Sequence, residues 1–206
     1  MDSLYNWLTK KDEGVIYYDF ETTGLNQYHD KIIEYCFINS NNDKITSLID
    51  PETKISEKIQ RITNINNEMV SGKPKIWQEL PNIVDFIKNS YRFNYLVAHN
   101  GDNFDKIFLQ TQLKKYDHNC LNYDWKYIDT LLLAKKLLPN NRSYSLKALL
   151  EYFNIVDQNN SHRADDDTMA LRNLYQELCR LLVTEITLSY EEIVSTPSIV
   201  YNYLYI

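Results

Sequence analysis

The sequence predicts an α/β fold, because strand patterns gather early in the chain and alternate with helical patterns later. Three apolar segments come first, and a turn signal at 41–43 joins the second and third as a hairpin. Two further strand patterns follow, each with a helical pattern after it. At 206 residues, the chain suits a single domain, 1–206, with a sizeable core.

The five predicted strands are apolar and rich in residues that favour β structure. They are expected at 15–19, 31–39, 44–49, 95–99 and 125–129. The first strand, 15–19, has the apolar and aromatic sequence of a buried strand.

The predicted helices lie between and after these strands. They are expected at 56–62, 76–89, 103–113, 130–138, 143–153 and 165–183. Pro81 falls inside the second and is expected to kink or restart it. Ser143 or Ser145 is the expected N-cap of the fifth. The core of the domain is expected over about 15–183. The tyrosine-rich segment 189–206, which Pro197 splits, is not assigned to a helix or a strand.

Composition and charge narrow the function classes. No apolar run reaches the roughly 20 residues that a membrane span needs, and the first residues lack the apolar core of a signal peptide. Three widely spaced cysteines suggest reduced thiols in an intracellular protein, in either cytoplasm or nucleus. A net charge of −6 disfavours a protein that coats duplex DNA by charge alone. It does not exclude an enzyme that holds one strand end beside metal ions.

Two carboxylates, Asp19 and Glu21, stand at the end of the first strand. Residues i and i+2 of a strand share a face, so the two side chains project together. Adjacent anions repel each other unless a cation joins them, and oxygen ligands favour a hard ion such as Mg²⁺ or Mn²⁺. The plainer alternative is a strand end whose two acids are merely solvated, so the metal hypothesis needs further ligands downstream.

Further acidic candidates occur at two helix starts. Asp105 lies in the first turn of the helix expected at 103–113, and Asp165, Asp166 and Asp167 open the longest helix, shortly after His162. Acids at helix starts are favoured by the helix dipole without any catalytic role. A lone histidine before a helix is likewise more often a cap or a surface residue than a base.

Three motifs in order make the chain resemble the DEDDh (DnaQ-like) 3′→5′ exonucleases, and within them the TREX type of three-prime repair exonucleases. The first motif is Asp19-Phe20-Glu21-Thr22-Thr23-Gly24-Leu25, the second spans Leu96 to Asp105, and the third is His162 followed by Asp167. Ile128-Asp129-Thr130, Arg142 to Leu146, and Ile59 to Lys73 with Asn64 in place of a common Gly are further landmarks. The resemblance covers about 15–182.

The resemblance implies an RNase H-like fold with a five-stranded mixed β-sheet flanked by helices on both faces. It also implies two Mg²⁺ ions, for which Mn²⁺ can substitute. Asp19 would bridge both ions, Glu21 and Asp167 would hold the catalytic one, and Asp105 would act directly or through water. His162 would be the general base, and the product a nucleoside 5′-monophosphate.

The third motif has a register question, because three aspartates are consecutive and a helix turns about 100° per residue. Family spacing selects Asp167. Substrate contacts are also implied by the resemblance, at the positions that would hold the terminal nucleotide or flank the site. These are Glu21, Thr22, Thr23, Leu25, His99, Asn100 and Tyr144.

The expected function is therefore metal-dependent removal of nucleotides from DNA 3′ ends, single-stranded or frayed. RNA stays open as a substrate, because the motifs do not encode the 2′-hydroxyl contact. A proofreading subunit bound to a polymerase, a homodimer, and a non-catalytic nucleic-acid-binding protein on a nuclease fold are further alternatives. A non-catalytic binding protein would not need all five of the residues Asp19, Glu21, Asp105, His162 and Asp167.

Overall fold

The computed structural model describes residues 14–90, 95–117, 123–155, 163–186 and 196–205. It contains a five-stranded sheet in the order β3-β2-β1-β4-β5. The strands are β1 (Val15–Thr22), β2 (Ile32–Asn39), β3 (Lys44–Leu48), β4 (Tyr95–Ala98) and β5 (Lys126–Asp129). β2 pairs antiparallel with both β1 and β3, whereas β1 pairs parallel with β4 and β4 with β5. The sheet is mixed, and the predicted hairpin of the second and third strands is confirmed.

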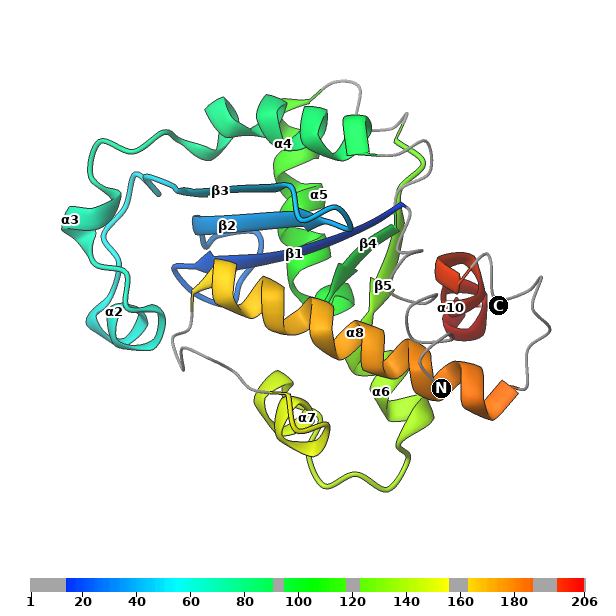
Figure 1. The fold of residues 1–206 in the computed structure, drawn as a ribbon. Coiled ribbons are helices and arrows are strands. Elements are labelled where there is room, and N and C mark those ends of the chain that lie inside the picture. Colours follow the sequence, from blue (N-terminus) through cyan, green and yellow to red (C-terminus); the bar gives the residue numbers. More distant parts are fainter. Residues whose placement is uncertain (1–13, 91–94, 118–122, 156–162, 187–195, 206) are drawn as a thin grey trace.

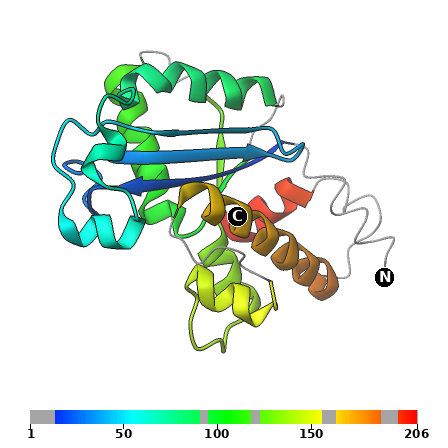
Figure 2. The ribbon, with the colours of Figure 1, turned by 60° about the vertical axis from the view of Figure 1, so that its left-hand side comes forward.

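Helices cover both faces of this sheet (Figures 1 and 2). One face packs against α6 (Thr130–Leu137), α7 (Leu146–Tyr152) and the long α8 (Ala164–Ile186). The other face packs against α4 (Ile76–Ser90) and α5 (Asp105–Tyr116). Side chains of β1 alternate between the two cores, with Val15 and Tyr17 under α8 and Ile16 and Tyr18 under α4 and α5. Both faces of the central strand are therefore buried, as its apolar sequence predicts.

Capping side chains define several helix ends. Ser145, not Ser143, is the N-cap of α7, where its hydroxyl accepts from the Ala148 N–H at 3.3 Å. α2 (Glu57–Thr63) ends at Asn64, whose φ of 56° is left-handed. Asn is the residue besides Gly that most readily takes this conformation, which explains how it can stand where the related motif has Gly.

α4 continues through Pro81 without a break in the assigned helix, so the expected restart does not occur. Pro81 lies in the second turn and removes one amide, the partner of the Trp77 carbonyl. The buried stripe of Leu80, Ile83, Val84 and Ile87 holds the helix on the sheet despite that loss.

Within the described residues, three elements lie outside the predicted set. They are α3 (Asn67–Val70), the 3₁₀ turn η1 (Gly101–Asn103) and α10 (Thr196–Tyr205). α10 falls in the segment that the sequence left unassigned, and it adds Val200 to the core beneath α8. Its end is tied back to the body by Lys136, which donates to the Leu204 carbonyl at 3.1 Å, and by the Tyr205 hydroxyl, which donates to Asp102 at 2.8 Å.

Among the described helices, none combines the length and the apolar character that crossing a lipid bilayer demands.

Candidate active site

The C-terminal half of β1 places two carboxylates on the face of the sheet that α8 covers. Asp19 and Glu21 follow Val15 and Tyr17 at alternate positions, so they share that face. On the neighbouring strand β2, Asp19 lies opposite Cys36 and Glu21 opposite Glu34. The register shifts just after Glu21, where the strand begins to leave the sheet.

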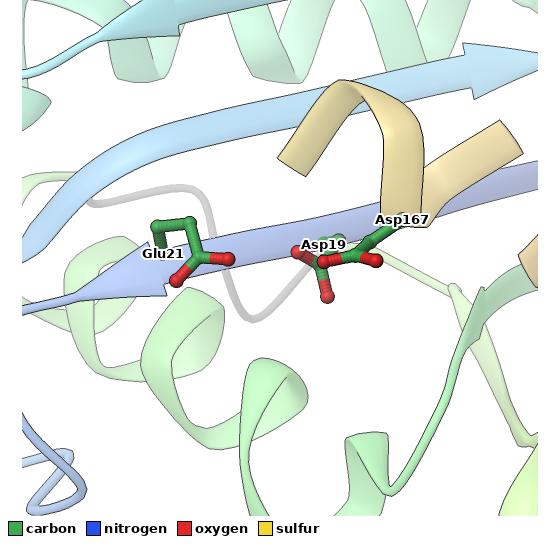
Figure 3. A group of neighbouring side chains, drawn as sticks. All are labelled: Asp19, Glu21 and Asp167. Atoms are coloured by element: carbon green, nitrogen blue, oxygen red, sulfur yellow. The ribbon is translucent and has the colours of Figure 1, made fainter. Parts of the chain in front are cut away.

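The first turn of α8 adds a third carboxylate to this pair (Figure 3). Asp19, Glu21 and Asp167 each offer an oxygen, and these oxygens lie within 4.8 Å of one another. All three side chains are half-buried. Asp165, two residues earlier, instead pairs with Lys44 of β3 at 2.6 Å. The structure thus places Asp167, the aspartate that the family spacing selects, beside Asp19 and Glu21.

Asp105 approaches the same strand from α5, of which it is the first residue. Its carboxylate accepts a hydrogen bond from the Phe20 backbone N–H at 3.2 Å, and its side chain is buried. It is not one of the three carboxylates that converge most closely. It nevertheless has the largest effect of any neighbouring charge on the pKa of Asp19, which it raises.

The electrostatics of the cluster are those of crowded, desolvated anions. Burial first, and then the charges of Asp105, Glu21 and Asp167, raise the pKa of Asp19 well above its usual value. Burial and the nearby Asp167 raise the pKa of Glu21 to about 8. Burial raises the pKa of Asp105 to about 7, although the Phe20 N–H and its own N–H oppose the shift. Without cations, the cluster therefore retains protons near neutral pH.

The donor set fits hard divalent cations. The three converging groups are all carboxylates, and oxygen-only ligands suit Mg²⁺ or Mn²⁺ better than they suit a soft metal. A cation would replace the retained protons and remove the repulsion that raises these pKa values. Asp19, Glu21 and Asp167 are the residues placed to hold it, with Asp105 adjacent.

His162, the predicted general base, lies outside the described residues. Arg163, the next residue in the chain, is described and makes a contact that the motifs did not indicate. Its guanidinium donates to both oxygens of Glu34, a carboxylate whose side chain is only 3% exposed. One signal could have found this pair, namely a lone acid in the otherwise apolar strand 32–38.

Of the predicted substrate contacts on the first motif, Leu25 is the most open, at 79% exposed. Thr22 is buried, and its hydroxyl donates to the Gly24 carbonyl at 2.7 Å. The Thr23 hydroxyl donates to Asp30 at 3.1 Å and accepts from the Lys31 N–H at 2.9 Å. The two threonines thus shape the turn, and Leu25 is presented to solvent from it.

The other predicted contacts are engaged inside the protein. His99 contacts the Thr130 hydroxyl through Nδ1 and the Tyr144 carbonyl through Nε2, both at 2.9 Å. A carbonyl only accepts, so Nε2 carries the proton, and burial lowers the pKa of His99 to about 4. The Tyr144 hydroxyl donates to the Leu138 carbonyl. The polar side-chain atoms of His99 and Tyr144 are therefore already bonded inside the protein.

Asn100 is held at the start of η1 in a left-handed conformation, with φ of 59°. Its backbone N–H donates to Asp129 at 2.9 Å, and the same carboxylate accepts from the N–H of Asp102 and of Leu131. Asp129, which the sequence marked only as a family landmark, therefore organises the loop that leads to Asp105.

Comparison with known proteins places these features among exonucleases. The family model RNase_T, described as Exonuclease, matches residues 16–175. The chain is 37% identical over 170 residues to the PolC-type DNA polymerase III of Thermotoga petrophila, covering 80% of this chain but only 12% of that protein. It is 30% identical over 180 residues to DNA polymerase III subunit epsilon of Treponema pallidum, covering 84% of this chain and 80% of the relative.

Solved structures agree on the fold. Exonuclease X in complex with 5′ overhanging duplex DNA aligns with a TM-score of 0.63 and 24% identity, over 89% of this chain and 99% of that one. The nuclease domain of 3′hExo, a DEDDh family member bound to rAMP, aligns with a TM-score of 0.66 and 19% identity, over 81% and 91%. The predicted RNase H-like fold is confirmed. The TREX-type subgroup stays a prediction.

Proposed function

Because this chain belongs to the exonuclease family, within the DEDDh (DnaQ-like) superfamily, we propose that it is a Mg²⁺-dependent 3′→5′ exodeoxyribonuclease. It releases nucleoside 5′-monophosphates from DNA 3′ ends, with single-stranded or frayed ends preferred. The observation that carries the proposal is the convergence of Asp19, Glu21 and Asp167, whose oxygens lie within 4.8 Å of one another. A binding protein without catalysis has no need of such a costly cluster.

The residues have distinct roles in this reaction. Asp19, Glu21 and Asp167 would hold divalent cations, and Asp105 of α5 would contact them directly or through water. Bound cations of this kind lower the pKa of an attacking water and stabilise a leaving oxygen. His162 takes the proton from the water as its oxygen forms the new bond to phosphorus. The bond from phosphorus to the 3′-oxygen breaks, that oxygen takes a proton from solvent, and the mononucleotide leaves.

The relatives support a second candidate, which concerns the biological setting. Several are DNA polymerase III proteins, and the chain spans 12% of the length of the PolC-type relative but 80% of the epsilon subunit. A proofreading role beside a polymerase is therefore proposed for this chain. Such a role requires removal of a mispaired 3′ nucleotide faster than a paired one, since the mispaired end frays more readily.

The test is digestion of 5′-labelled single-stranded DNA, duplex DNA and RNA, side by side, with Mg²⁺ and with excess chelator. A labelled ladder that shortens one nucleotide at a time from the 3′ end, with no reaction in chelator, is expected for single-stranded DNA, and chromatography of the unlabelled product should show nucleoside 5′-monophosphates. Asp19→Asn, purified in the same way, is the control for contaminating nucleases. Faster digestion of RNA would reassign the substrate, and the absence of cleavage on all three would leave the non-catalytic alternative.

The proofreading candidate needs a separate comparison. Two duplexes that differ only in a paired or mispaired 3′-terminal nucleotide are digested under single-turnover conditions. Faster removal of the mispaired nucleotide is expected. Equal rates on both duplexes, with normal activity on single strands, would contradict a proofreading role while leaving the exonuclease assignment intact.

A further inference from the structure

We propose that Glu34 and Arg163 are positioning residues whose ion pair, buried on the Glu34 side, fixes the first turn of α8, so that Asp167 meets Asp19 and Glu21. Glu34 lies outside the three motifs, Arg163 stands between the two residues that define the third, and neither is one of the converging carboxylates. The inference rests on the proposed metal site, since it concerns the residue that completes that site.

The contacts between the two residues form a clamp, a name used here for Glu34, Arg163 and the Ala164 N–H. Arg163 Nε lies 3.1 and 3.0 Å from the two Glu34 oxygens, and its Nη2 also donates to Oε1. The Ala164 N–H donates to Oε2 at 3.0 Å. One carboxylate on β2 thus accepts from both the side chain and the backbone at the start of α8, in the forked geometry that only Arg supplies.

The clamp connects directly to Asp167. The Asp167 N–H donates to the Arg163 carbonyl at 3.0 Å, which is the first backbone bond of the helix. Fixing Arg163 and Ala164 against β2 therefore fixes the turn from which the Asp167 side chain projects. Ala164 is itself fully buried against Cys36 and Ile38, the β2 residues that follow Glu34 on the same face.

The position of Glu34 on the sheet explains why the clamp acts at this site. Glu34 lies directly opposite Glu21 in the β1–β2 pairing. The clamp therefore ties α8 to the strand beside the two β1 carboxylates, at their own level along the sheet. Positioning by a fixed outer partner is how metal ligands are generally held in place.

A neighbouring ion pair provides a comparison within the same turn. Lys44 of β3 pairs with Asp165 of α8, but these side chains are 39% and 40% exposed. In the clamp, Glu34 is 3% exposed and Arg163 34%. An exposed pair is screened by water and contributes little, whereas a buried acid must keep its partners. The Lys44 pair is therefore the matched control.

Charge and position predict opposite effects at Arg163. If its guanidinium acted only as a charge, its removal would strengthen cation binding, because a nearby positive charge would be lost. If it positions Asp167, its removal weakens cation binding. Arg163→Lys separates the two cleanly, since it keeps the charge and loses the fork.

The experiment measures Mn²⁺ binding by isothermal titration calorimetry without substrate, while thermal unfolding verifies the fold. We expect the Kd of Arg163→Lys to rise about tenfold, the size usual for lost outer partners of metal ligands. Arg163→Ala should weaken binding further, and Lys44→Ala should leave the Kd within about twofold of wild type.

Three results would overturn the inference. They are wild-type Kd in a folded Arg163→Lys, tighter binding in Arg163→Ala, or an equal loss in Lys44→Ala. If Arg163→Ala does not fold, Arg163→Lys still decides the question. A wild-type protein that binds no Mn²⁺ would overturn the proposed function as well, so the two failures are distinguishable.

Discussion

Three consecutive aspartates open α8, and Asp167 meets the β1 carboxylates. Asp165 pairs with Lys44 instead. It lies two residues before Asp167, and a helix turns about 100° per residue, so the two side chains point to different sides of α8. We expect Asp167→Asn to abolish cleavage and Asp165→Asn to retain most of it. The latter should cost at most about 1 kcal/mol of unfolding free energy, because its ion pair is exposed. Initial rates on a single-stranded oligonucleotide and chemical denaturation of both variants provide the measurement.

The opposite outcome would be informative about register. Loss of activity in Asp165→Asn with an active Asp167→Asn would mean that the first turn of α8 rotates when metal and substrate bind. Loss in both, with an intact fold, would mean that the whole acidic turn contributes charge to the site.

His162 gives a second prediction at the level of one side chain. Loss of a general base typically lowers the rate about 10²–10⁴-fold, so His162→Ala should lower kcat by that order and leave Mg²⁺ binding unchanged. The wild-type rate should fall below about pH 6.5 as the imidazole protonates, and the variant should lack that limb. Single-turnover pH–rate profiles of both proteins test this. A variant within a few-fold of wild type, with the same acid limb, would exclude His162 as the base.

Individual residues also show which features of the site could be predicted from the sequence and which could not. Strand alternation, which is local geometry, placed Asp19 and Glu21 on one face, whereas Asp167 was selected among three consecutive aspartates by the family spacing alone. The family resemblance also marked His99 and Tyr144 as substrate contacts, although the His99 ring bonds to the Thr130 hydroxyl and the Tyr144 carbonyl, and the Tyr144 hydroxyl donates to the Leu138 carbonyl. Those partners lie 6 to 45 residues away in the chain, a relation that no local pattern contains.

Among the elements, the turn after β1 is held by one carboxylate. Asp30 accepts from the Thr23 hydroxyl at 3.1 Å and from the Asn26 N–H at 2.9 Å. A Cβ on Gly24 would lie 2.5 Å from Asp30 Oδ2, so a larger residue there must push the Asp30 side chain out of its present position. Gly24→Ala must displace Asp30 and break both bonds. We expect a loss of about 1–3 kcal/mol in unfolding free energy and a several-fold rise in KM for an oligonucleotide, because Leu25 is presented from this turn.

Gly72→Ala is the matched control for that prediction. Gly72 has a φ of 72° and open space around its Cβ position, so alanine strains the backbone there without touching a neighbour. Its stability loss should be similar, at about 1 kcal/mol, while KM stays unchanged. A rise in KM in both variants would show that general destabilisation, and not the turn, controls substrate binding.

The elements were predictable where their sequence pattern was clear. All five strands occur where apolar, β-favouring segments indicated them, and α2, α4, α5, α6, α7 and α8 occur where helical patterns did, with ends shifted by a few residues. α3 spans 4 residues and η1 spans 3, too short to show a period. α10 contains Pro197 near its start, which the sequence suggested as a break, although proline is tolerated in the first turn of a helix.

For the whole molecule, the strand order could not come from periodicity. β1 lies in the centre, between β2 and β4, because it pairs antiparallel on one side and parallel on the other. That order depends on pairing between residues 80 apart in the chain, such as Val15 with Tyr95, and the family resemblance predicted only that the five-stranded sheet is mixed. The clamp between β2 and α8 is of the same kind, with its partners 129 residues apart.

The site also couples the stability of the whole molecule to pH and metal. Burial and neighbouring carboxylates raise the pKa of Glu21 from 4.5 to about 8 and that of Asp105 from 3.8 to about 7. Between the unfolded and folded values, the unfolded chain is ionised while the folded protein keeps its protons. The folded state then binds more protons than the unfolded state, so the free energy of unfolding falls as pH rises through this window.

In excess chelator, the melting temperature should therefore fall steadily between about pH 5.5 and 8. Mg²⁺ binds the ionised cluster, so its stabilising effect should be larger at pH 8 than at pH 6, because at the lower pH it must displace protons. Glu21→Gln should flatten the chelator curve and weaken the Mg²⁺ effect, whereas Glu57→Gln, which changes an acid 85% exposed in a surface pair, should change neither. Differential scanning calorimetry across this pH range, with and without Mg²⁺, measures all three proteins. A wild-type melting temperature that is flat or rises with pH in chelator would contradict the raised pKa values and, with them, the physical need for a cation at this site.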